Sequence, residues 1–357
     1  MMRVSTTRHL GSIAALALCG VRCLRPLRPR LDLLPIGVLK GVRMYRPLFG
    51  WNLALLLAVC TVALAGTAHA EPTKCRAAIA KSSASFAQAK MKALQKCQEN
   101  IVKGKFTGVC PDDDAKTKDK ITKAAQKLKD GIAKACGGKD KQCGTSDEGE
   151  DTMPSIGWDI SCPNFENSAD PNCSKAITNC SHIGECLECI GEKAVDQAIS
   201  LYYGSLNLPS TADKVLNKCQ LAIGKSATAF FTAKSKALQK CWDKVNKNAA
   251  KGLLTPPCPP FGTGDGKAQG TIDKASVKNK TAICKACGGT DKNCLGADDL
   301  HRGDIGFPQT CPFVTVPSTP PRACERTNVL VPDIVDCVEC VSEFKVDCLS
   351  LAAATGI

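Results

Sequence analysis

Nine cysteines occur in the same order in both halves of this chain. Four of their spacings are identical in the two halves: 21 residues between the first two cysteines, six after the fourth, twelve before the last pair and two within that pair. The intervening sequence also matches, for example SFAQAKMKALQKC (85–97) with AFFTAKSKALQKC (229–241). The shared cysteines are Cys75, Cys97, Cys110, Cys136, Cys143, Cys162, Cys173, Cys186 and Cys189, matched by Cys219, Cys241, Cys258, Cys287, Cys294, Cys311, Cys324, Cys337 and Cys340. The pattern predicts a duplicated domain whose shape is set by disulfides.

The N-terminus is typical of an exported protein. Residues 44–70 combine Arg46, an uncharged apolar run from Leu53 to Gly66, and a small-x-small ending at Ala70. We therefore expect a signal peptide that is cleaved after Ala70, with an uncleaved membrane anchor as the alternative. Residues 1–43 form an arginine-rich extension that signal peptides rarely carry, which predicts that translation starts at Met44.

Removal of residues 1–70 changes the charge and the cysteine count. This segment contains nine of the 47 basic and one of the 34 acidic residues, so the net charge falls from +13 to +5. The remaining positive charge is too weak to predict a nucleic-acid partner. Of 24 cysteines, 21 remain, a number typical of a disulfide framework in a secreted or periplasmic protein. No membrane span is expected in the processed chain.

Helical periodicity predicts an all-α, disulfide-rich fold with two tandem repeats, at 71–206 and 215–357, joined by a linker at 207–214. In each repeat we expect two helices in an antiparallel hairpin and a third helix, at 184–204 in the first repeat, that carries Cys-x-x-Cys. A long irregular loop precedes the third helix. In the first helix the apolar side chains lie on one face, and Lys81, Lys90, Lys92 and Lys96 are expected mainly away from it.

The hairpin predicts four disulfides. Two antiparallel helices of similar length bring the first shared cysteine to the fourth at one end, and the second to the third at the other. The predicted pairs are Cys75–Cys136, Cys97–Cys110, Cys219–Cys287 and Cys241–Cys258. A bond inside Cys-x-x-Cys on a helix is strained, so we expect Cys186 and Cys189 to anchor two separate loop strands. Their partners would come from Cys143, Cys162, Cys173 and Cys180.

Each repeat has nine shared cysteines, an odd number. One shared cysteine in each repeat must therefore bond to a cysteine outside these nine or remain a free thiol. Cys180 completes the first repeat, whereas the second has two extra cysteines, Cys284 and Cys348. Because 21 is odd, the sequence predicts at least one thiol without an intramolecular partner, with Cys284 and Cys348 as the candidates. Alternatives are a bond between the two repeats and a disulfide-linked partner.

The two Cys-x-x-Cys motifs and their neighbours allow redox or zinc chemistry as well as a structural role. Redox pairs of the thioredoxin kind lie between a strand and a helix. The sequence around both Cys-x-x-Cys motifs predicts helix and no strand, so it does not favour a redox pair. Zinc ligands are available at Cys180, His182, Cys186 and Cys189, but the second repeat has Val331 and Asp333 at the first two positions.

The remaining candidates are weaker still. The acidic stretches 146–151 and 296–300 offer carboxylates for calcium but are also typical of solvated loops. Trp158 and Phe307 occupy matched positions, where a core role is favoured over a sugar-stacking platform.

The leading prediction is a non-enzymatic, exported structural or binding protein with no cofactor. The sequence does not identify a partner: lysine-rich helix faces are usually solvated, and if they bind a ligand, an anionic surface polymer is the expected one. The alternative is a thiol redox or metal-handling protein that uses the Cys-x-x-Cys motifs.

Overall fold

A computed structural model describes residues 71–145, 149–163, 165, 173–208, 211–318 and 320–355. The expected N-terminal extension, signal peptide and cleavage site lie outside these residues. The described chain is mostly helical, with a single two-stranded sheet, and is rich in disulfides, so the prediction of a helical, disulfide-rich fold is confirmed. None of its helices has the length and apolar character that crossing a bilayer requires.

The first half contains three long helices and a short one. They are α3 (Pro72–Val102), α4 (Ala115–Cys136), α5 (Met153–Ile156) and α6 (Cys180–Tyr203). Polar side chains fix two of the starts: Asp114 accepts hydrogen bonds from the backbone N–H groups of Lys116 and Thr117, and Asn179 caps α6 in the same way.

The second half has the same helix order with a small sheet inserted. Its elements are α7 (Lys214–Ala249), α8 (Lys267–Cys287), α9 (Arg302–Ile305), β1 (Thr315–Val316), β2 (Arg322–Ala323) and α10 (Val331–Thr355). The strands pair antiparallel, with Thr315 opposite Ala323. At two residues each, they are too short to produce an alternating sequence pattern.

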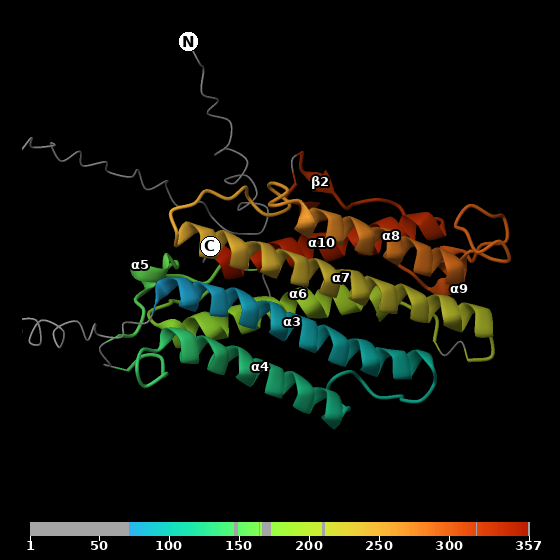
Figure 1. Ribbon diagram of the computed structural model, residues 1–357. Helices are drawn as coiled ribbons and strands as arrows, with labels where there is room; N and C mark the ends of the chain where they lie inside the picture. Colours follow the sequence, from blue (N-terminus) through green and yellow to red (C-terminus); the bar gives the residue numbers. More distant parts are fainter. Residues whose placement is uncertain are drawn as a thin grey trace, which may run out of the picture. The chain divides into compact units, whose positions relative to one another are not determined.

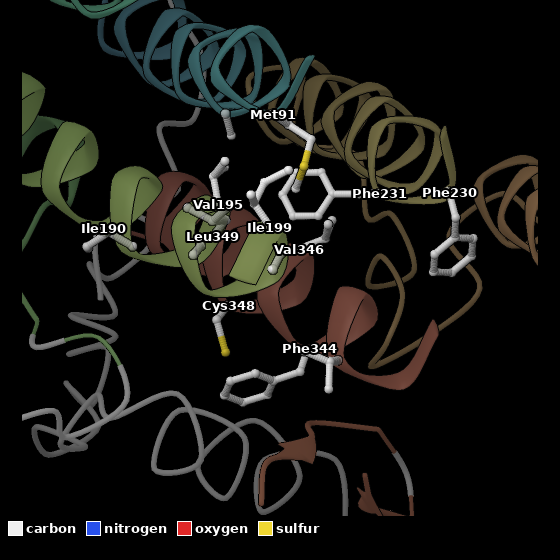
Figure 2. Packing of buried hydrophobic residues seen from close by; sticks show 14 of the residues in the cluster. Met91, Ile190, Val195, Ile199, Phe230, Phe231, Phe344, Val346, Cys348 and Leu349 are labelled. Atoms are coloured by element: carbon white, nitrogen blue, oxygen red, sulfur yellow. The ribbon is translucent and has the colours of Figure 1, made fainter. Parts of the chain in front are cut away.

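The long helices lie alongside one another in one compact unit (Figure 1). α3 packs against α4, α6, α7 and α10, and α7 packs against α8, α3, α10 and α6. Their buried side chains form one hydrophobic cluster, and Figure 2 shows part of this core, including Met91 of α3, Ile199 of α6, Phe231 of α7 and Leu349 of α10. The two halves therefore share a core.

Ten disulfides join described cysteines. The structure contains the four pairs expected at the helix ends: Cys75–Cys136, Cys97–Cys110, Cys219–Cys287 and Cys241–Cys258. Such a density of disulfides fits an extracellular or other oxidising compartment.

The assignment of Cys284 as an unpaired thiol is wrong, because Cys284 bonds to Cys294. A tight turn at Gly288-Gly289 leads the chain back along the end of α8, and the two Cα atoms are 5.0 Å apart. In the first half the matching loop cysteine, Cys143, instead bonds to Cys180 at the start of α6. The shared cysteine that has no partner within the shared set is thus Cys143 in the first half and Cys294 in the second. Cys143 bonds to Cys180 and Cys294 bonds to Cys284, and neither of these partners has a counterpart in the other half.

Cys348 was the other candidate for an unpaired thiol, and it too is disulfide-bonded.

Candidate binding groove and cysteine motifs

Both Cys-x-x-Cys motifs anchor loops. In α6, Cys186 bonds to Cys162 and Cys189 bonds to Cys173. In α10 the matched bonds are Cys311–Cys337 and Cys324–Cys340. Each sulfur is bonded to a different loop strand, so neither motif forms an internal disulfide in this structure. A dithiol that cycles between reduced and oxidised forms would need its two sulfurs to bond to each other.

The four residues weighed as zinc ligands are not available together as a site. Cys180, Cys186 and Cys189 are all in disulfides with loop cysteines. His182 receives a hydrogen bond at Nδ1 from the backbone N–H of Thr178, at 3.3 Å. Zinc binds thiolates, so this arrangement gives no support to the zinc alternative.

A buried lysine bound by two acids occurs once in each half, and sequence reasoning missed both. Lys90 Nζ lies 2.9 Å from Asp196 and 3.3 Å from Glu192. Lys234 Nζ lies 2.9 Å from Asp347 and 3.4 Å from Glu343. The lysines, and likewise the acids, occupy matched positions in the self-alignment. Two repeated sequence features could have indicated these clusters: a lysine shortly before KALQKC, and a Glu-x-x-x-Asp motif shortly after Cys-x-x-Cys.

These clusters differ in burial. Lys234 and Asp347 are almost fully buried, whereas Glu192 and Asp196, the acids that bind Lys90, have side chains 43% and 55% exposed. Burial lowers the pKa of Lys234 and raises the pKa of Asp347, and the attraction between the two charges opposes both shifts. Both clusters tie the first helix of a half to its third helix, which is a structural role.

A groove runs along the surface between α7 and α8. One section, of about 670 Å³, has a floor formed mainly by small apolar side chains and Phe230. A second section, of about 660 Å³, continues it toward the end of α3 and shares Ala222, Lys225 and Ala282 with the first. Both sections are shallow and open to solvent.

Lysines line both sides of this groove. Lys214, Lys218 and Lys225 lie on α7, and Lys274, Lys278 and Lys285 lie on α8, all six exposed. In both rows the lysines are spaced by four and then seven residues, so each row extends for about 17 Å. Lys103 and Lys105 of the α3 end complete the set.

No acidic residue lines either section of the groove. Within the described chain, Lys103 and Lys225 are the groove lysines that form an ion pair, both with Glu99. The groove therefore has a positive rim above an apolar floor, and six of the eight rim lysines form no ion pair within the described chain.

The groove lining differs from the matched residues of the first half at several positions, among them Ala282, which matches Gly131. There, Gly131 of α4 lies so close to α3 that a Cβ would be 2.5 Å from Ser82 Oγ. The matched residues of the second half are Ala282 and Ser226, both in the groove lining. Ala282 therefore adds to the groove lining a methyl group that Gly131 lacks.

Comparison with protein-family models, curated proteins and solved structures found no match to this chain.

The aromatic pair at matched positions lies in the core. Trp158 is 8% exposed and Phe307 is 1% exposed. Neither offers a ring face to a ligand such as a sugar, so the structure favours the core role for both.

Proposed function

We propose that this chain is an exported, disulfide-stabilised binding protein without a catalytic site, and that the α7–α8 groove binds an extended anionic polymer. The observation that carries the proposal is the pair of lysine rows above an apolar floor, with no acid between them. An extended polymer fits because the rows are long and the groove is open, whereas a small ligand is usually enclosed by its pocket.

The proposed architecture is a tandem duplication of residues 71–206 and 215–357, joined at 207–214. In each copy the first two helices form an antiparallel hairpin and the third carries Cys-x-x-Cys. Support comes from the matched order of helices and from four disulfides per half at matched positions. We further propose that translation starts at Met44 and that the signal peptide is removed after Ala70.

The absence of a catalytic role is part of the proposal. Its support is that the groups most able to do chemistry are already bound: the motif cysteines hold loops, and the two buried lysines are paired with acids. The rival function, thiol redox or metal handling, would require the motif sulfurs to leave these loop partners.

Binding of fluorescein-labelled dextran sulfate, measured by anisotropy at several salt concentrations, tests the groove. The variant Lys218→Gln/Lys225→Gln/Lys274→Gln/Lys278→Gln should bind about 30-fold more weakly at low salt, if each exposed ion pair contributes ~0.5 kcal/mol. Wild-type affinity should fall as salt increases, because mobile ions screen exposed charges.

The first half supplies a matched control. Lys74, Lys81, Lys123 and Lys127 occupy the corresponding positions, so their replacement by Gln removes the same charge from the α3–α4 side. This control should retain affinity within a few-fold of wild type. Equal losses in the two quadruple variants, or no binding by the wild type, would contradict the proposed groove.

A further inference from the structure

The loop between α8 and α9 brings three carboxylates together. Asp291, Asp298 and Asp299 each place one oxygen within 4.8 Å of the other two. Two oxygens that bind one Ca²⁺ at about 2.4 Å can be at most about 4.8 Å apart, so the spacing permits a shared ion. Within the described chain, these three residues form no ion pair with a lysine, arginine or histidine.

The three oxygens surround a space that Gly296 leaves open. A Cβ built on Gly296 would lie 2.7 Å from Asp298 Oδ1, 3.2 Å from Asp299 Oδ1 and 3.3 Å from Asp291 Oδ2. Any side chain at position 296 would occupy this space. Glycine is therefore the residue that keeps the centre of the cluster free.

Asp299 supplies a second observation that points to a ligand. The residue is 8% exposed, and its Oδ1 is buried without a hydrogen-bond partner in the described structure. A buried carboxylate oxygen without a partner is unfavourable, because it has lost water and gained nothing in return. This is the same oxygen that faces the space beside Gly296.

Neighbouring groups hold the other two carboxylates in place. Thr290 donates to Asp298 Oδ2 through both its backbone N–H and its hydroxyl, at 2.7 Å each. Asn293 donates its backbone N–H to Asp291 Oδ1 and its side-chain amide to Asp291 Oδ2.

We propose that Asp291, Asp298 and Asp299 form a Ca²⁺ site, with water completing the coordination. The ligands are all oxygens, which calcium prefers, and Cys294 in the same loop is bonded to Cys284 and offers no thiolate. Calcium tolerates irregular geometry, whereas Mg²⁺ demands a near-ideal octahedron at shorter distances. Three carboxylates in a surface loop predict a dissociation constant of about 10⁻⁴–10⁻³ M, the range of extracellular calcium modules.

The first half does not repeat this arrangement at the positions that the structure describes. Glu150, which the self-alignment matches to Asp299, accepts hydrogen bonds from the backbone N–H of Gly144 through both oxygens. Asp140 matches Asp291, is exposed, and accepts from the backbone N–H of Gln142. Asp140 therefore serves as a control position outside the proposed site.

Calorimetric titration of the disulfide-intact protein with CaCl₂ tests the site, with MgCl₂ as a second titrant. We expect one saturable Ca²⁺ site, much weaker Mg²⁺ binding, and a rise in Tm of about 3–6 °C at roughly tenfold excess over the dissociation constant. Asp299→Asn and Gly296→Ala should each weaken binding at least tenfold, and Asp140→Asn should leave it unchanged.

Stability without calcium separates loss of the site from loss of the fold. Asp299→Asn removes a repelling charge, so its Tm in chelator should equal or exceed that of the wild type. Unchanged Ca²⁺ affinity in both site variants, or no binding heat from the wild type at millimolar calcium, would overturn the proposal. The site does not depend on the groove, so failure of polymer binding would leave this result unaffected.

Discussion

The ammonium group of Lys234 donates to the carboxylate of Asp347 at 2.9 Å, and both side chains are almost completely shielded from water. This pair joins α7 to α10. Lys90 and Asp196 join α3 to α6 at the same 2.9 Å, but with a half-exposed acid. The same pair of charges thus occupies two environments in one protein, which allows the effect of burial to be measured.

Replacement of Lys234 by Met should destabilise the protein by about 3–5 kcal/mol, because Asp347 would remain buried without its counter-charge. Lys90→Met is the matched control and should cost about 1 kcal/mol, since its acids keep contact with water. Urea denaturation followed by circular dichroism measures both values. Similar losses in the two variants would show that the Lys234 pair is not buried in solution.

The stability of the protein should rise with pH between about 7 and 10. Lys345 is 3% exposed, donates to Gln197 and lies 5.3 Å from the ring centres of Phe165 and Phe344. Burial lowers its pKa to about 7, while an unfolded lysine keeps a pKa of about 10.4. In that window the unfolded chain binds a proton that the folded chain does not, so the free energy of unfolding increases with pH.

Lys345→Met should reduce the increase of the unfolding free energy with pH, whereas the control Lys236→Met, at an exposed position, should not. Some slope should remain, because burial also lowers the pKa of Lys234. Above about pH 10 stability should fall again, since burial raises the pKa values of Tyr202 and Tyr203 while unfolded tyrosines ionise near 10. Denaturation series across this pH range give the comparison, and an unchanged slope in Lys345→Met would contradict it.

Gly224 and Gly270 should respond in opposite directions to replacement by alanine. A Cβ on Gly224 would lie 2.0 Å from Cζ of Tyr203, where α6 ends against α7, whereas one on Gly270 meets no atom within 4 Å. We expect Gly224→Ala to destabilise the protein by about 1–3 kcal/mol. Gly270→Ala should stabilise it by ~0.5–1 kcal/mol through helix propensity. A stabilising Gly224→Ala would show that Tyr203 does not pack on α7.

The helical class and the hairpin cysteine pairs could be predicted because they depend on local periodicity and helix length. Cys75 and Cys97 are too far apart along one helix to bond, so their partners had to lie on another element. Cys284 could not be assigned in this way. Both Cys180 and Cys284 are placed to reach the odd loop cysteine of their half, and the choice depends on the path of the loop.

Lys90 shows where periodicity alone fails. It was expected away from the apolar face of its helix, yet it is 5% exposed, because α3 contacts five other helices and has little free surface. The groove depends on packing between helices, which a self-alignment does not reveal. The calcium loop requires side chains to converge in three dimensions around Gly296.

The central claim is that the Cys-x-x-Cys cysteines are structural anchors in an oxidised framework. Peptide mapping of the native, alkylated and unreduced protein tests it most directly. We expect peptides that link Cys162 to Cys186, Cys173 to Cys189, Cys311 to Cys337 and Cys324 to Cys340. A Cys186–Cys189 or Cys337–Cys340 bond, or alkylated thiols at these positions, would contradict the claim and favour the redox alternative.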